Sequence, residues 1–261
     1  MSSILVPVDG SELSERILSL LGRLPNPAAL ELFLVTVVEP APTATHHVVA
    51  LAYLTGLEKR LRERGFQVQH AIQEGDPAER ILATAAMLRP SLLALSTRGK
   101  GEAEGRGSVA EAVLMACPVP LLIANPDPLP LDPGQGFARI LVPLDGTPTS
   151  ARILPHVEGL ALQFDSEVIL LNVGINDADV RDLTPQREAL EKAGVKRVEG
   201  ITRVGDPAEV ILAVAAETSP DLLALTSHSH PETVRAFGSV AEALVRDAPC
   251  PVLVDRQNPP G

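Results

Sequence analysis

A glycine-rich loop that leads into a helix is the part of the sequence best suited to binding chemistry. From Ser96 to Ser108 the chain reads STRGKGEAEGRGS, with four glycines among residues 99–107, and the helix-forming stretch VAEAVL follows. Free backbone N–H groups in such a loop and the positive end of the helix dipole suit a phosphate group. Three basic residues outnumber two acidic ones in it: Arg98, Lys100 and Arg106. We expect an anion site here, although a simple surface loop also accounts for the glycines.

Two aspartates stand at the ends of matching apolar stretches. Asp9 lies in VPVDGS and Asp145 in VPLDGT. A carboxylate in this place caps the helix that follows, or it faces a ligand in the crevice at the end of the strand. The residues alone leave both interpretations open.

The counterpart of the glycine-rich loop, in the second half of the chain, keeps only its last two residues. It reads TSHSHPETVRAFGS over 226–239, where one arginine offsets one glutamate. Phosphate binding is therefore less favoured there. His228 and His230 have the spacing of a short metal pair, but no further ligand types stand nearby, so we expect no metal site. No catalytic triad or G-x-S-x-G motif is legible, which favours a non-catalytic protein.

These candidate residues belong to two copies of one sequence. Three segments return almost unchanged: ILVPVDGS at 4–11 as ILVPLDGT at 140–147, GDPAERILATAA at 75–86 as GDPAEVILAVAA at 205–216, and GSVAEAVL at 107–114 as GSVAEALV at 238–245. So long a period indicates duplication of a whole domain. We predict domains at 1–125 and 138–256, joined by a Pro/Gly-rich linker at 126–137.

Each copy alternates short apolar strands with helices. In the first copy we expect strands at 4–8, 30–38, 66–72, 92–95 and 119–123, and helices at 11–21, 46–64, from Asp76 onward, and at 107–116. Asp76, Pro77 and Glu79 form a strong helix start. The second copy repeats this order with a shortened second helix at 185–193. Apolar strands alternating with helices predict an α/β fold with a parallel sheet covered on both faces.

Paired prolines mark the last predicted strand of each copy: Pro118 with Pro120, and Pro249 with Pro251. Because they are two residues apart, their missing N–H groups fall on the same side of an extended strand. This spacing predicts an edge strand in each copy, available to pair with the other edge or with a partner.

Composition excludes several classes of partner. The 261 residues carry a formal net charge of −11, which argues against nucleic acid and anionic membranes. Aromatic residues make up 2%, so the core must be aliphatic. No apolar run approaches the roughly 20 residues of a membrane span, and no secretory segment is legible. Cys117 and Cys250 suit small buried hydrophobes in a reducing compartment. We expect a cytoplasmic protein.

Together the motifs resemble the universal stress protein family. VPVDGS, EGDPAERIL, LLALSTRGKG, GSVAEAVL and CPVPLLI stand in that family's order, and the second copy adds VPLDGT, VGDPAEVIL, GSVAEALV and APCPVLV. The resemblance spans almost the whole chain outside the linker and the second helix. It implies the tandem form, with two Rossmann-like (adenine nucleotide alpha hydrolase-like) domains. Each has a five-stranded parallel sheet of order 3-2-1-4-5. It also implies pairing of the domains through their last strands, with a homodimer as a further option.

The resemblance also implies a ligand. Family members that bind ATP hold its phosphates on a G-x2-G-x9-G-[ST] loop, with the remainder near the first-strand aspartate and the end of the second strand. Carried over, these positions fall on Asp9, Val37 or Val38, Gly99, Gly107 and Ser108. We expect the rest of the nucleotide site to comprise Ser96, Val109 and the basic residues Arg98 and Lys100. A weaker second site comprises Asp145, Val173, Gly238 and Ser239. The ligand that the resemblance implies is ATP or another adenine nucleotide, with or without Mg²⁺.

The loops depart from the family pattern. Ser96 replaces the first motif glycine, and seven residues instead of nine separate Gly99 from Gly107. In the second copy, eight residues separate Ser229 from Gly238. Some family members lack the motif and do not bind ATP. We therefore expect a regulatory stress-response protein that binds an adenine nucleotide mainly in its first copy. The alternatives are a non-binding interaction module and a weak nucleotide hydrolase.

Overall fold

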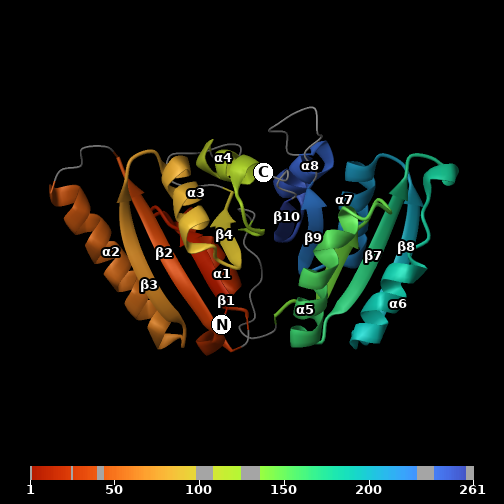
Figure 1. The fold of residues 1–261 in the computed structure, drawn as a ribbon, viewed down its shortest axis with the longest axis horizontal. Coiled ribbons are helices and arrows are strands. Elements are labelled where there is room, and N and C mark those ends of the chain that lie inside the picture. The colour runs from red at the N-terminus through yellow and green to blue at the C-terminus, as the bar shows by residue number, and fades with distance from the viewer. Residues whose placement is uncertain are drawn as a thin grey trace. The chain divides into compact units, whose positions relative to one another are not determined.

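The computed structural model describes residues 2–24, 26–39, 44–97, 108–124, 136–227 and 238–256. The chain divides into two compact units, Met1–Gly134 (unit 1) and Gln135–Gly261 (unit 2). Each unit is an α/β domain built on a parallel sheet with helices packed against it (Figure 1). The predicted fold class is confirmed.

Unit 1 contains five strands and four helices within its described residues. The strands are β1 (Ser2–Pro7), β2 (Leu30–Val38), β3 (Gln67–Glu74), β4 (Leu92–Ser96) and β5 (Leu121–Ala124). The helices are α1 (Glu12–Leu21), α2 (Ala44–Glu63), α3 (Pro77–Leu88) and α4 (Ser108–Ala116). The strands lie in the order β3-β2-β1-β4-β5 and pair in parallel, as predicted.

Unit 2 repeats this arrangement. Its strands are β6 (Arg139–Pro143), β7 (Glu167–Gly174), β8 (Arg197–Val204), β9 (Leu222–Ser227) and β10 (Val252–Arg256). Its helices are α5 (Leu154–Phe164), α6 (Thr184–Ala193), α7 (Pro207–Thr218) and α8 (Ser239–Asp247). The order β10-β9-β6-β7-β8 is the same topology, with β6 and β9 in the places of β1 and β4.

Three short 3-10 helices were not expected from the sequence. They are η1 (Pro27–Ala29), η2 (Ser150–Ile153) and η3 (Asp177–Asp179). The η2 turn leads directly into α5, so the first helix of unit 2 begins as a tighter helix than its counterpart α1. The η3 turn belongs to the loop between β7 and the short helix α6.

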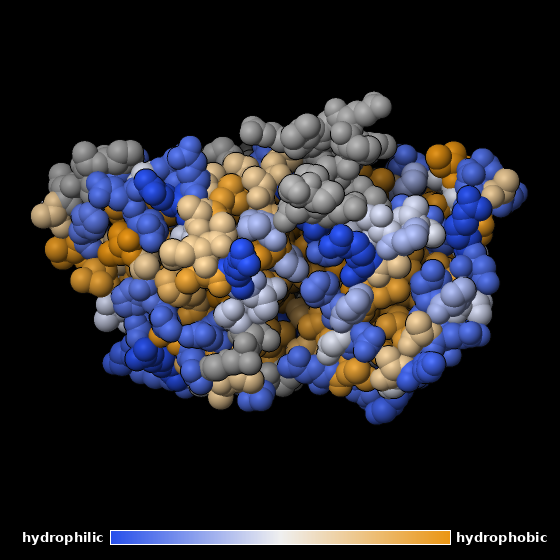
Figure 2. Space-filling view, in the orientation of Figure 1, coloured by the Kyte–Doolittle hydropathy of each residue, from blue (hydrophilic) through white to orange (hydrophobic). Residues whose placement is uncertain are grey.

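The core of each unit is aliphatic. Leu5 and Leu93 in unit 1, and Leu141 and Leu223 in unit 2, lie on the two central strands and are fully buried. Hydrophobic residues also reach the surface of the molecule (Figure 2). On α2, for example, Val48 is 65% exposed. No helix in the described part of the chain has the length and apolar character that a membrane span needs.

The last strand of each unit begins later than predicted, so the paired prolines precede the strand instead of lying in it. β5 starts at Leu121 and β10 at Val252, so both prolines of each pair lie before the strand. The carbonyl oxygens of Pro120 and Pro251 accept the first hydrogen bonds from the neighbouring strands, at 2.9 and 3.0 Å. A proline can accept but not donate, so the start of a strand is an ordinary place for it. The prolines therefore lie outside the strands, although β5 and β10 do stand at the end of the strand order within their units, as predicted.

Candidate functional site

The first-strand aspartate of unit 1 orients the residue that caps α1. Its Oδ1 accepts hydrogen bonds from the backbone N–H of Ser11 at 2.9 Å and from the Ser11 hydroxyl at 2.7 Å. The Ser11 Oγ accepts in turn from the N–H of Ser14 at 3.1 Å. The N-cap is therefore Ser11, and the interpretation of Asp9 as the cap itself is wrong. Only a side chain two residues further on reaches the free N–H groups of the first turn.

Unit 2 builds the same relay from homologous residues. Asp145 Oδ1 accepts from the N–H and the hydroxyl of Thr147 at 2.8 and 2.6 Å, and Thr147 Oγ1 accepts from Ser150 N–H at 3.1 Å. The glycine after each aspartate, Gly10 or Gly146, has a φ of +82°, a conformation that disfavours other residues. The D-G-[ST] sequence thus fixes each carboxylate at the end of a central strand.

The two units differ at the end of the fourth strand. In unit 1 the Ser96 Oγ is buried and has no hydrogen-bond partner. The corresponding hydroxyl in unit 2, that of Thr226, donates to the carbonyl oxygen of Ser150 at 3.3 Å. At this place in the fold, the hydroxyl of unit 2 therefore has a hydrogen-bond partner within the protein, whereas the hydroxyl of unit 1 has none.

Val37 and Val38 lie on the last rungs of β2, opposite Gln73 and Glu74 of β3. The Val38 carbonyl accepts from Gly75 N–H at 3.0 Å. Beside these residues, the Thr36 hydroxyl donates to the Val8 carbonyl at 2.8 Å and ties the ends of β1 and β2 together. The residues predicted near the part of the nucleotide beyond its phosphates thus lie at the ends of two neighbouring strands, β1 and β2.

Four residues of the predicted phosphate loop lie outside the described residues: Arg98, Gly99, Lys100 and Gly107. His228 and His230 of the second copy also lie outside them. Their roles stay predictions. Ser108 and Val109 form the first turn of α4. Within the described chain, no group of three or more His, Cys, Asp or Glu residues is placed to hold a metal ion.

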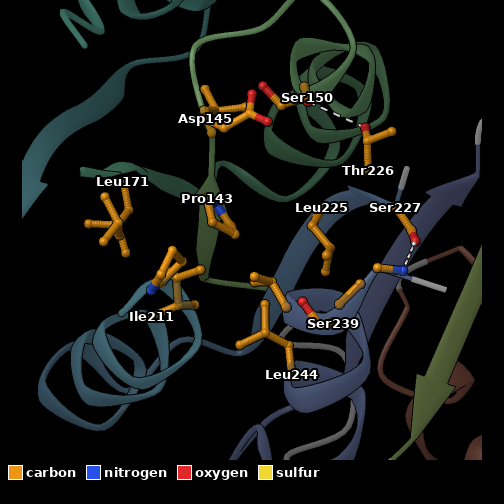
Figure 3. A pocket seen from close by; sticks show the side chains of 16 residues that line it. Pro143, Asp145, Ser150, Leu171, Ile211, Leu225, Thr226, Ser227, Ser239 and Leu244 are labelled. Atoms are coloured by element: carbon orange, nitrogen blue, oxygen red, sulfur yellow. Dashed lines mark hydrogen bonds between the residues drawn. The ribbon is translucent and has the colours of Figure 1, made fainter. Parts of the chain in front are cut away.

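A cavity of about 530 Å³ opens at the carboxyl ends of β6, β7 and β9, against α7 and the first turns of α8 (Figure 3). All four residues predicted for the second site line it: Asp145, Val173, Gly238 and Ser239. Figure 3 shows the polar side chains of Asp145, Ser150 and Thr226 on one side, and Leu171, Ile211 and Leu244 on the others. Hydrophobic walls with a few convergent polar groups are typical of small-molecule sites.

Tyr53 on α2 is a neighbour of the unit 1 site that the sequence analysis missed. Burial raises the pKa of its phenol, and the carboxylates of Glu15 and, further away, Asp9 add to the effect. The phenol oxygen is buried without a hydrogen-bond partner of ordinary geometry, and the Glu15 carboxylate is its main charged neighbour. Glu15 also pairs with Arg60 at 2.9 Å. One signal was available, because Tyr53 is the only tyrosine in a chain without tryptophan.

Comparison with known proteins supplies a family and a fold. The model of the universal stress protein family matches residues 1–125 and 174–256. A curated universal stress protein relative from Staphylococcus aureus (strain USA300) is 30% identical over 141 residues, covering 46% of this chain and 84% of the relative.

Two solved structures share the fold along nearly the whole chain. A universal stress protein from Archaeoglobus fulgidus DSM 4304 matches with a TM-score of 0.81 and 22% identity over 98% of both chains. A protein of unknown function from Pseudomonas aeruginosa PAO1 matches with a TM-score of 0.72 and 15% identity, over 98% of this chain and 92% of that one.

Proposed function

Since the chain belongs to the universal stress protein family, we propose that it is a tandem stress-response protein that binds an adenine nucleotide in unit 1. Its role in this proposal is regulatory and not catalytic. ATP is the ligand we favour, because the loop predicted to hold phosphate carries Arg98 and Lys100. Both side chains would neutralise a polyphosphate.

The unpartnered Ser96 hydroxyl is the observation that carries the proposal. Leaving a buried hydroxyl without a hydrogen bond costs about 1–3 kcal/mol, which an oxygen atom of a ligand would recover. The strand order of unit 1 reverses between β1 and β4, and ligands of open α/β sheets bind at such a switch point. Asp9 follows β1 and Ser96 ends β4, so these two residues flank it.

The residues present fit an adenine nucleotide. Ser96 and the first N–H groups of α4, at Ser108 and Val109, would hold phosphate oxygens. Asp9 would accept hydrogen bonds from ribose hydroxyls or contact Mg²⁺, which keeps several waters and needs few protein ligands. The strand end at Val37 and Val38 would border the base. These groups bind and orient a nucleotide, and the nucleotide itself carries the phosphates.

A binding role agrees with the surroundings of Ser96. Among the described residues at the switch point, Asp9 is the only carboxylate at a strand end that could act as a general base, and its Oδ1 already accepts two hydrogen bonds. The alternative of a weak hydrolase would need Asp9 in that role. We place the protein in the cytoplasm, where the buried thiols of Cys117 and Cys250 would stay reduced.

Calorimetric titration of ATP into matched glycine variants tests the proposal. Gly107→Asp puts a carboxylate into the predicted phosphate site and should abolish binding. Gly238→Asp is the matched change in unit 2, and this variant should retain most of the ATP binding. The control suits the fold, because Gly238 is the N-cap of α8 with a φ of −58°, and aspartate is a favoured N-cap residue.

The outcomes separate the alternatives. Bound ATP at 100 times its dissociation constant should stabilise the wild type by about 2.7 kcal/mol, without release of phosphate. Neither heat nor a thermal shift at millimolar ATP would favour the non-binding interaction module. Equal losses in the two variants would contradict the assignment to unit 1. Phosphate release that scales with protein and disappears in Asp9→Ala would favour the hydrolase.

A further inference from the structure

The outer face of α3 in unit 1 exposes apolar side chains near the end of the helix. Met87 is 71% exposed and Leu88 is 39% exposed. Ala83 and Ala86 are also exposed and lie on the same side of the helix as Met87, because residues three or four apart share a helix face. The other side of α3 packs against β2, β3 and α4 (Figure 1). Neighbouring apolar side chains on the outer face of a helix are typical of a contact with another protein.

Two arginines flank this apolar face. Arg80 lies about one turn before Ala83, and Arg89 follows the helix as its C-cap. Both side chains are exposed, and within the described residues neither guanidinium is held in an ion pair. Glu79 is the one acidic residue of the helix. The face of α3 therefore carries a surplus of positive charge in a chain whose net charge is −11.

The homologous helix of unit 2, α7, carries the opposite charge on its outer face. Ala213 and Ala216 are exposed there, as their counterparts are on α3. Exposed glutamates, Glu209 and Glu217, flank them, and the helix contains no lysine or arginine. Glu217 takes the place that Met87 has in unit 1. The outer face of α7 is therefore small at its centre and acidic at both ends.

The two faces also match in the spacing of their charges. Arg80 and Arg89 are nine positions apart, and Glu209 and Glu217 are eight positions apart. If α3 and α7 lie antiparallel with their alanines opposite each other, Arg80 comes within one turn of Glu217, and Arg89 within one turn of Glu209. The antiparallel direction also sets the two helix dipoles against each other favourably. Glu217 already pairs with Arg203, but at 4.0 Å between exposed side chains, which stabilises little.

Pairing of either helix with its own copy would match the charges less well. Two α3 faces would bring two surpluses of positive charge together, and two α7 faces would bring four carboxylates together. A contact between α3 and α7 joins opposite charges instead. In the antiparallel alignment, Met87 also lies opposite Val210 and Leu212, which are partly exposed.

We infer that the outer face of α3 is a docking surface for α7 of a second copy of this chain. Because the contact joins different surfaces of the two copies, it is heterologous, and assembly continues with concentration unless a ring closes. A single pair of helices is smaller than a standard protein interface, so the association is weak. The inference does not depend on nucleotide binding or on pairing through the last strands.

Sedimentation equilibrium from micromolar to millimolar protein tests the inference with a charge exchange. The average mass of the wild type should exceed that of one chain and rise with concentration. Arg80→Glu and Glu217→Arg should each weaken association at least about tenfold, since each places like charges together. The double variant should return to within about threefold of the wild type. Both changes suit the helix dipoles, because Arg80 is in the first turn of α3 and Glu217 is in the last turn of α7, so the variants should fold.

The overall charge of the chain predicts a different result. Glu217→Arg replaces a charge of −1 by +1 and changes the formal net charge from −11 to −9, which by itself would favour self-association. Glu188→Arg makes the same change on α6 and is the matched control, which should not weaken association. Met87→Glu gives α3 the residue of α7 and should weaken it.

Three results would overturn the inference. The first is a wild type that keeps the mass of one chain at millimolar concentration. The second is association of Arg80→Glu or Glu217→Arg as strong as that of the wild type, which would assign any assembly to another surface. The third is a double variant that associates no better than the single variants. Absence of ATP binding would count only against the proposed function of unit 1.

Discussion

At the scale of single residues, the hydroxyl at the end of the fourth strand distinguishes the two copies. The Ser96 Oγ is buried without a hydrogen-bond partner, and the hydroxyl of Thr226 in the same place donates to Ser150. Both residues carry a hydroxyl, so the sequence difference looks conservative. The structural consequence is larger, because a buried hydroxyl without a hydrogen bond destabilises the folded state and can bind an atom of a ligand.

Ser96→Ala should therefore change stability and binding in opposite directions. Removing the unpartnered hydroxyl should raise the free energy of unfolding of the unliganded protein by up to about 1 kcal/mol, while weakening ATP binding. Urea unfolding and ATP titration measure the two effects. The control Thr226→Val removes a hydroxyl that has a partner and should lower stability by about 1 kcal/mol. A similar decrease in the free energy of unfolding of Ser96→Ala would show that the Ser96 hydroxyl does have a hydrogen-bond partner.

Cys250 should make the protein less stable in alkali. Burial raises the pKa of its thiol to about 12 from 9.0, and the Asp221 carboxylate adds to this. Because the unfolded thiol loses its proton first, stability present below about pH 9 should fall as the pH rises toward 12, by at most about 1.4 kcal/mol per pH unit. The raised pKa of Tyr53 acts in the same direction. Urea unfolding at several pH values should show that the free energy of unfolding decreases less steeply with pH in Cys250→Ala. An unchanged decrease would show that the Cys250 thiol is not its cause.

At the scale of elements, the third helix of each unit begins at a side-chain cap. Asp76 Oδ1 accepts from Glu79 N–H at 2.9 Å, and Asp206 Oδ1 accepts from Ala208 and Glu209 N–H at 3.0 and 3.1 Å. Proline at the first helical position completes each start. We expect Asp76→Ala and Asp206→Ala each to cost about 1 kcal/mol in urea unfolding, and Asp→Asn at either position to cost much less. A negligible cost for alanine would mean that packing alone holds these helices.

These helix starts could be predicted because all their determinants lie within four consecutive residues. The alternation of apolar strands with helices was equally local, whereas the strand order came from the resemblance to a family. The sequence left open whether Asp9 caps α1 and did not single out Ser11, because the choice depends on which oxygen reaches the first turn after a glycine at φ +82°. The start of the last strand was predicted too early for a related reason, since β5 begins only after Pro120, whose carbonyl accepts from Leu93.

The candidate sites were less accessible to sequence reasoning. The cavity of unit 2 forms where β6, β7 and β9 meet α7 and α8, and its residues are spread over most of the unit. The unsatisfied state of Ser96 depends on neighbours that are distant in sequence. Both are properties of packing, which a pattern of residue types along the chain does not encode.

At the scale of the whole molecule, duplication has produced two units of one topology with different strand-end chemistry. Unit 1 has the unpartnered Ser96 hydroxyl, followed in the sequence by a loop with basic residues. In unit 2, Asp145 and mostly apolar side chains line a cavity. A net charge of −11 opposes the binding of nucleic acid by either unit. Pairing of the units through their last strands, and a homodimer, stay predictions.

A crystal structure of the full chain, from crystals grown with ATP, tests most directly the central claim that unit 1 binds an adenine nucleotide. The account predicts density for an adenine nucleotide at the switch point between β1 and β4, with its phosphates toward the start of α4. It predicts no phosphate density between β6 and β9. A nucleotide with ordered phosphates in the cavity of unit 2, or an empty switch point in unit 1 at saturating ATP, would contradict it.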